Sequence, residues 1–188
     1  MSYNIVGNWK AGWALDLHTT SSVKLPNGKF ENTYSDIGLA LYKLKYSQDY
    51  SQTEYLADCI CDFLRTRMVT PYISVILPTP ASRIRDIQPV YEVCKLVSEK
   101  LGIPYDEDYI NKVKNTSQLK EVEDVDERRS MLSGAFDVTT TYRNKKVLLI
   151  DDLFRSGSTL KEITKTMGDK GGVSNVYVVT LTKTRVHR

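Results

Sequence analysis

"KKVLLIDDLFRSGSTLKE" (residues 145–162) runs from four large aliphatic residues straight into two aspartates, and then into a small polar segment with one glycine. An unbroken apolar run of this kind is typical of a strand that is buried on both faces, as in a parallel sheet. A helical pattern begins at about Ser158. The sequence therefore predicts that Asp151 and Asp152 lie where a buried strand ends and before a helix starts.

Two further stretches have the same continuous apolar character, "YISVIL" (72–77) and "NVYVVTL" (175–181). Two stretches with helical spacing separate the three strands. One is a helix from Ser158 to Met167, which ends at Gly168 and the Gly171-Gly172 pair. In the other helix, apolar residues recur every three or four positions, at Ile87, Val90, Tyr91, Cys94, Val97 and Leu101. This alternation predicts an α/β fold, with a mostly parallel twisted sheet flanked by helices.

The regions outside this alternation are less regular. A helix is expected over residues 51–64, opened by the capping-box spacing of Ser51 and Glu54. Residues 111–136 are strongly charged and long for a connection, which is typical of a functional or a disordered segment. Residues 1–50 show only a short helical pattern, at Ile37, Leu41 and Leu44. We therefore expect an N-terminal hood (residues 1–50) over a core of residues 51–188.

Composition limits the class of protein. A length of 188 residues, with 41% hydrophobic and 26% charged residues, suits one globular domain with a small appendage. No apolar run is long enough for a membrane span, and the polar start does not resemble a signal peptide, so a cytoplasmic protein is expected. The spacing of Cys59, Cys61 and Cys94 fits free thiols rather than disulfides or zinc. The net charge of +3 does not indicate a nucleic-acid partner, despite a modest basic tail.

The aspartates and the loop after them suit a sugar phosphate. Two adjacent carboxylates accept hydrogen bonds from a vicinal diol or hold a hydrated Mg²⁺. The segment "RSGST" (155–159) supplies hydroxyls and backbone N–H groups at a helix N-terminus, which bind phosphate. Taken singly, Asp-Asp is often a solvated turn and Gly-Ser-Thr a helix cap. Together, after a buried strand, they favour a ribose 5-phosphate site.

"VLLIDDLFRSGSTL" resembles the phosphoribosyl-pyrophosphate signature of type I phosphoribosyltransferases. The resemblance implies that fold and a Mg²⁺ cofactor, with catalytic and metal-binding roles for Asp151 and Asp152 at the ribose hydroxyls. The phosphate-loop positions that it implies are Ser156, Gly157, Ser158 and Thr159. Arg155 stands where the family has its first threonine, and it either adds a contact to the phosphate or points to solvent.

A narrower resemblance, to ComF-type phosphoribosyltransferases, covers roughly residues 34–182. It rests on the order of four segments: "LALYKLKY" (39–46), "VILPTPASRIR" (75–85), "SQLKEVEDVDERRSMLSGAF" (117–136) and the Asp-Asp motif. The chain departs from that family in two places. It lacks the usual N-terminal four-cysteine zinc segment, and "RDIQPVYE" replaces the family's "RGFNQ" stretch.

The same resemblance suggests where pyrophosphate and the acceptor bind. Thr79 and Arg83, in the loop after the first central strand, are placed to hold pyrophosphate; the alternative is a proline-rich strand exit with solvated arginines. The charged stretch 112–130 resembles the mobile catalytic loop and includes Arg128, although its acidic residues equally suit a solvated helix. The hood offers rings for stacking on a planar acceptor or for the core: Trp9, Trp13, His18, Tyr34 and Tyr46.

The sequence thus predicts a Mg²⁺-dependent phosphoribosyltransferase, which is a pentosyltransferase among the glycosyltransferases. Its substrates would be phosphoribosyl pyrophosphate and a small-molecule acceptor such as a nitrogenous base, and a homodimer is a family-level expectation. The alternative is a non-catalytic ComF-like module that binds phosphoribosyl pyrophosphate or a nucleotide in regulation or DNA uptake. A phosphate-switch or phosphohydrolase site explains the carboxylates but not the glycine-bearing loop.

Overall fold

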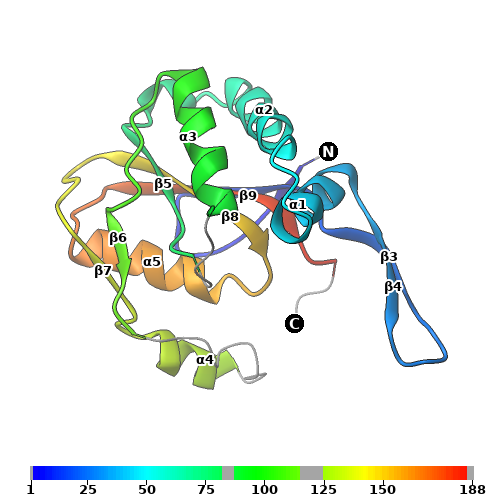
Figure 1. The fold of residues 1–188 in the computed structure, drawn as a ribbon. Coiled ribbons are helices and arrows are strands. Elements are labelled where there is room, and N and C mark those ends of the chain that lie inside the picture. The colour runs from blue at the N-terminus through cyan, green and yellow to red at the C-terminus, as the bar shows by residue number, and fades with distance from the viewer. Residues whose placement is uncertain (1, 82–86, 115–124, 186–188) are drawn as a thin grey trace.

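A five-stranded sheet forms the centre of the protein in the computed structural model, which describes residues 2–81, 87–114 and 125–185 (Figure 1). The strands follow the order β1-β2-β9-β8-β5. Neighbours from β2 to β5 are parallel, and β1 is antiparallel to β2. Their bounds are β1 Tyr3–Asn4, β2 Ala11–Leu17, β5 Val75–Pro78, β8 Lys146–Phe154 and β9 Asn175–Lys183.

Helices cover both faces of this sheet (Figure 1). On one face lie α1 (Asp36–Tyr46), α2 (Gln52–Arg65) and α3 (Pro89–Leu101), and on the other lies α5 (Ser158–Asp169). Successive β8 residues alternate between the two cores, because side chains alternate across a strand. Leu148 and Ile150 pack with α1–α3, whereas Val147 and Leu149 pack with α5. This arrangement confirms the predicted α/β fold.

The remaining elements lie outside the central sheet. Strands β3 (Thr19–Lys24) and β4 (Phe30–Tyr34) form an antiparallel hairpin that projects from the body (Figure 1). The charged segment contains β6 (Ile110–Lys112), paired with β7 (Phe136–Val138), and the helix α4 (Val125–Leu132) between them. A 3₁₀ helix, η1 (Thr70–Tyr72), precedes β5. No helix in the described ranges is both long and apolar enough to cross a membrane.

The bounds of the central strands β5 and β8 differ from the sequence prediction. The first central strand starts at Val75 rather than at residue 72, because Pro71 and Tyr72 belong to the 3₁₀ turn. The second continues through both aspartates to Phe154, because β9 keeps pairing with it beyond the end of β5. The aspartates are therefore part of a strand rather than of the turn that follows it.

The predicted capping box at α2 is wrong. Ser51 has helical backbone angles (φ −62°, ψ −21°) and its side chain caps no backbone N–H. Its hydroxyl donates instead to the Asp49 carboxylate. Glu54, the other half of the expected box, lies 3.3 Å from the Lys100 ammonium of α3.

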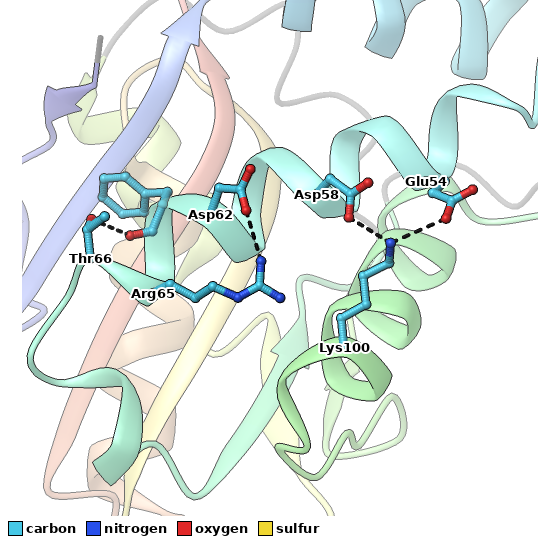
Figure 2. A network of polar contacts seen from close by, with 7 residues as sticks. Glu54, Asp58, Asp62, Arg65, Thr66 and Lys100 are labelled. Atoms are coloured by element: carbon cyan, nitrogen blue, oxygen red, sulfur yellow. Dashed lines mark hydrogen bonds and ion pairs between the residues drawn. The ribbon is translucent and has the colours of Figure 1, made fainter.

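Helices α2 and α3 are joined by buried apolar contacts and by ion pairs at their surface. Figure 2 shows Lys100 between Glu54 and Asp58, with the shorter contact, 2.6 Å, to Asp58. Exposed pairs of this kind contribute little to stability. The buried side chains between the helices, among them Ile60 and Val97, carry the packing. Cys61 and Cys94 also lie in this core, and all three cysteines are free.

The hood segment divides between two structural roles. Strand β1 pairs with β2, which in turn pairs in parallel with β9, from Ala11 opposite Tyr177 to Leu17 opposite Lys183. These two strands of the hood segment therefore belong to the central sheet. The hairpin β3–β4 and α1 then lie beside that sheet. The sequence does not predict strand β2, because Gly12 and Asp16 interrupt its short apolar run.

Candidate active site

The carboxyl ends of β2, β9, β8 and β5 share one edge of the sheet, which we call the carboxyl edge. Along it lie His18 after β2, Thr182 in β9, Asp151 and Asp152 in β8, and Thr79 after β5. In open α/β sheets, ligands bind outside this edge. Residues separated by more than 160 positions in the sequence are thus neighbours in one site.

The Asp pair is accessible because β8 is longer than β5. The last pairing between those strands joins Pro78 to Ile150, whereas β9 continues beside Asp151 with Thr180. The two aspartates therefore have a paired strand neighbour on one side only. On the other side Thr79 follows the end of β5, and its hydroxyl contacts Asp151.

Asp151 is held by two hydrogen bonds to one oxygen. Its Oδ1 accepts from the Thr79 hydroxyl at 2.7 Å and from the Asp152 backbone N–H at 2.9 Å. Its Oδ2 accepts no hydrogen bond from the described residues. Burial, with a smaller contribution from the Asp152 charge, raises the pKa of Asp151 to about 6, despite the opposing Thr79 hydrogen bond. The site thus contains a carboxylate that is costly to charge, as is common at functional sites.

Asp152 forms an ion pair with Lys45 through its Oδ2. Lys45 comes from the last turn of α1 and is 16% exposed, against 22% for Asp152. The Asp152 carbonyl also accepts from the Thr182 hydroxyl at 3.1 Å. Lys45 is not among the site residues that the sequence predicts; the available signal was its place directly after the buried Leu44 in "LKY".

The loop after β8 encloses a cavity of about 110 Å³, lined by Asp151 and residues 153–160. Gly157 is the N-cap of α5 in the left-handed conformation (φ 75°). The hydroxyls of Ser156 and Ser158 lie 3.0 Å apart. N–H groups in the first turn of a helix have no partner within that helix and can bind an anion. All five predicted loop residues, 155–159, therefore line one small polar cavity beside Asp151.

The side chains of Trp9 and Phe154 pack against this loop at Gly157. Their rings meet edge to face at 6.3 Å, and the Trp9 indole N–H donates to the Ile5 carbonyl at 3.0 Å. A Cβ atom on Gly157 would lie 2.7 Å from the Phe154 ring and 3.4 Å from Trp9. The loop conformation thus depends on a glycine and on a residue from the N-terminal segment.

Gly157→Ala is expected to lower the free energy of unfolding by about 2 to 3 kcal/mol, because it combines left-handed strain with the Phe154 overlap. Gly102→Ala is the matched control, since Gly102 has φ 65° with no atom within 4 Å of its Cβ position; strain alone should cost about 1 kcal/mol. Urea denaturation of both variants measures the difference. Equal losses would contradict the role of the Phe154 contact.

The predicted site residues with charged side chains, and Thr79, do not all lie in this cavity. Arg155 is exposed and forms no hydrogen bond or ion pair with the described residues. Arg83 lies outside the described residues. Arg128 is in α4, and nothing is described of its side chain. The Thr79 hydroxyl donates to Asp151 Oδ1, and its predicted contact with pyrophosphate stays a prediction. The structure thus brings Thr79, the aspartates and residues 155–159 together.

The candidate stacking rings fall into two groups. Trp13 is packed in the core against Tyr177 and Phe63, and Trp9 is buried in the second core, next to the loop of residues 155–159. In contrast, a chain of rings joins His18 to Tyr34 at 5.4 Å and then continues along α1 through Tyr42 and Tyr46. This row of rings begins at the carboxyl edge and ends in solvent, where Tyr46 is 64% exposed.

A scan against protein-family models matches residues 91–186 to the phosphoribosyl transferase domain. This protein belongs to the phosphoribosyl transferase domain family. The matched range contains both aspartates and the loop of residues 155–159. The mostly parallel sheet flanked by helices confirms the predicted type I phosphoribosyltransferase fold.

Solved structures of phosphoribosyltransferases resemble the chain distantly. UMP synthase from Leishmania donovani is 16% identical with a TM-score of 0.46; the match covers 87% of this chain but only 28% of that longer one. Hypoxanthine phosphoribosyltransferase from Staphylococcus aureus is 18% identical, with 72% and 67% covered and a TM-score of 0.45. Orotate phosphoribosyltransferase from Aeropyrum pernix is 11% identical, with 87% and 86% covered and a TM-score of 0.42. A comparison with curated proteins finds no match.

Proposed function

We propose that this phosphoribosyl transferase domain is an active enzyme that takes phosphoribosyl pyrophosphate as donor. Asp151 and Asp152 would accept hydrogen bonds from the ribose hydroxyls, and the loop of residues 155–159 would bind the 5-phosphate. The observation that carries this proposal is the continuity of the two parts, because Asp151 itself lines the cavity that the loop encloses. The carboxylates would then bind the hydroxyl end of one ribose 5-phosphate, and the loop would bind its phosphate end.

The carboxylates also suit Mg²⁺. This ion prefers oxygen ligands and binds through one or two carboxylates together with substrate phosphates and water. Asp151 Oδ2 and Asp152 Oδ1 accept no hydrogen bond from the described residues, so both are available to it. No group of three or more His, Cys, Asp or Glu side chains in the described ranges forms a metal cage. Bound Mg²⁺ would supply positive charge to the departing pyrophosphate.

The protein itself would position the ribose and stabilise the positive charge that develops in the reaction. Displacement at the anomeric carbon passes through a transition state with oxocarbenium character, as the family resemblance implies. Carboxylates at the ribose hydroxyls lie close to that developing positive charge and stabilise it. The 5-phosphate in the loop fixes the ribose, which orients the anomeric carbon toward the acceptor.

The acceptor would bind beneath the part of the hood that borders the carboxyl edge, namely the ring row His18, Tyr34, Tyr42 and Tyr46. Planar rings stack on aromatic side chains, so a nitrogenous base is the proposed acceptor class. The ComF-like assignment belongs to the same proposal. In its support, the "LKY" segment of that resemblance carries Lys45, the ion-pair partner of Asp152.

A second candidate is a module that binds phosphoribosyl pyrophosphate without turning it over. Two observations favour it: Arg155 replaces a loop threonine and is exposed, and Lys45 already neutralises Asp152. Pyrophosphate release separates the two functions. The protein would be mixed with Mg²⁺, phosphoribosyl pyrophosphate and, in turn, adenine, guanine, hypoxanthine, uracil and orotate. Release with one base supports the enzyme; binding of the donor without release by any base supports the module.

A further inference from the structure

His18 lies at the carboxyl edge, immediately after β2. Its backbone N–H donates to the Lys183 carbonyl of β9 at 2.8 Å. Helix α1 lies close to it: a Cβ atom added to Gly38 of that helix would be only 2.1 Å from the His18 carbonyl oxygen. The imidazole is partly buried and meets the Tyr34 ring edge to face. The ring is therefore held between the sheet, the hairpin and α1.

The tautomer of this imidazole is coupled to the hydrogen bonds of the Thr182 hydroxyl. The Thr182 hydroxyl is fully buried and donates its single proton to the Asp152 carbonyl at 3.1 Å. Its oxygen lies 3.3 Å from His18 Nδ1. With its proton given to the Asp152 carbonyl, the hydroxyl oxygen can only accept from Nδ1, which then carries the ring proton. In a neutral imidazole, the other nitrogen then has an unprotonated lone pair. Nε2 has no hydrogen-bond partner in the described part of the chain.

The surrounding charges favour the neutral ring. The titratable groups nearest to it come from three elements: Lys45 of α1, Asp152 of β8 and Tyr34 of β4. Arg185 also lies in this region, bonded to the Thr20 carbonyl. Burial and the Lys45 charge lower the pKa of His18 below 6.5, and Asp152 opposes them more weakly. The imidazole is therefore available as a base at neutral pH.

We propose that His18 is a catalytic base, whose Nε2 takes up the proton that the acceptor loses as it attacks the anomeric carbon. The inference rests on the proposed phosphoribosyl transfer and narrows its acceptor to a neutral N–H heterocycle. The acceptor N–H bond breaks, the nitrogen forms its bond to the anomeric carbon, and the bond to pyrophosphate breaks with its electrons. The proton stays on Nε2, and the Asp152 charge favours the imidazolium.

His18→Asn tests the role of Nε2 separately from the fold, because the asparagine amide reproduces the Nδ1–H donor toward Thr182 and lacks Nε2. We expect the variant to bind phosphoribosyl pyrophosphate within about threefold of the wild type and to release pyrophosphate about 10² to 10⁴ times more slowly. Protonation of Asp151 lowers the rate of both proteins at low pH, but only the wild type also loses rate as His18 is protonated. The ratio of the wild-type rate to the variant rate should therefore shrink as pH drops below His18's pKa. A variant rate equal to the wild type would overturn the proposal.

A second measurement decides the proposal without any acceptor. Nitrogen-15 NMR of the imidazole at neutral pH should show a neutral ring protonated on Nδ1. The protein has two histidines, so a His187→Gln variant assigns the signals. A ring protonated on Nε2, or an imidazolium, would overturn the role of His18 even if phosphoribosyl transfer occurs. Failure of the wild type to bind the donor would instead contradict the proposed function.

Discussion

Replacing Asp152 with asparagine is expected to weaken binding of phosphoribosyl pyrophosphate with Mg²⁺ by about 100-fold or more. Hydrogen bonds to a charged group contribute about 1.5 to 3 kcal/mol, and the amide also removes a candidate metal ligand; about 3 kcal/mol corresponds to about 100-fold in affinity. Calorimetric titration of both proteins at one pH and ionic strength measures the change. Retained affinity would show that the Asp152 carboxylate does not contact the donor.

The control for this variant must remove the same ion pair and keep the carboxylate. Lys45→Met does so, because Lys45 Nζ pairs with Asp152 Oδ2. Binding within about tenfold of the wild type is expected for Lys45→Met. If both variants lose binding equally, the ion pair and the placement of α1 matter more than the carboxylate itself. Far-ultraviolet circular dichroism of each variant confirms that it is folded.

Asp151→Asn is expected to stabilise the ligand-free protein by about 2 to 3 kcal/mol at about pH 7.5, while abolishing donor binding. The pKa of Asp151 is raised from 3.8 to about 6, mainly by burial, so its charged form is costly in the folded state. An asparagine oxygen still accepts from Thr79 and from the Asp152 N–H. The substitution thus removes the buried charge and keeps both hydrogen bonds.

The sign of the pH dependence follows from the raised pKa. Between about pH 4 and pH 6 the folded protein binds more protons at Asp151 than the unfolded chain does, so wild-type stability falls as pH rises through this range. The advantage of Asp151→Asn should therefore be largest above pH 6 and nearly absent near pH 4. Urea denaturation with a chelator present, at several pH values, measures it. An advantage that does not change with pH would contradict the assigned cause.

The features that the sequence predicts are local in the chain. The apolar run, the two aspartates and the loop to Thr159 lie within 14 residues, so their proximity follows from covalent connection. The strand–helix alternation then places them at the carboxyl edge. For the same reason the parallel pairing of β8 with β9 and the cover by α3 and α5 were predictable.

The contacts that complete the site are not local. Thr79, Lys45 and His18 reach the aspartates only because β5, α1 and β2 meet the same edge as β8. No periodicity in the first fifty residues predicts that β2 pairs with β9. The sequence offers Trp9 for acceptor stacking, but its burial next to the loop of residues 155–159 depends on the same strand order. Strand order is a property of the whole chain, which single-sequence patterns do not specify.

The most direct test of the central claim, that one ribose 5-phosphate spans the aspartates and the loop of residues 155–159, is a competition experiment. Wild-type protein with Mg²⁺ would be titrated with phosphoribosyl pyrophosphate, alone and in the presence of ribose 5-phosphate. We predict one donor molecule per chain, with an apparent affinity that falls as ribose 5-phosphate increases. No binding of the donor, or binding that ribose 5-phosphate leaves unchanged, would contradict the account.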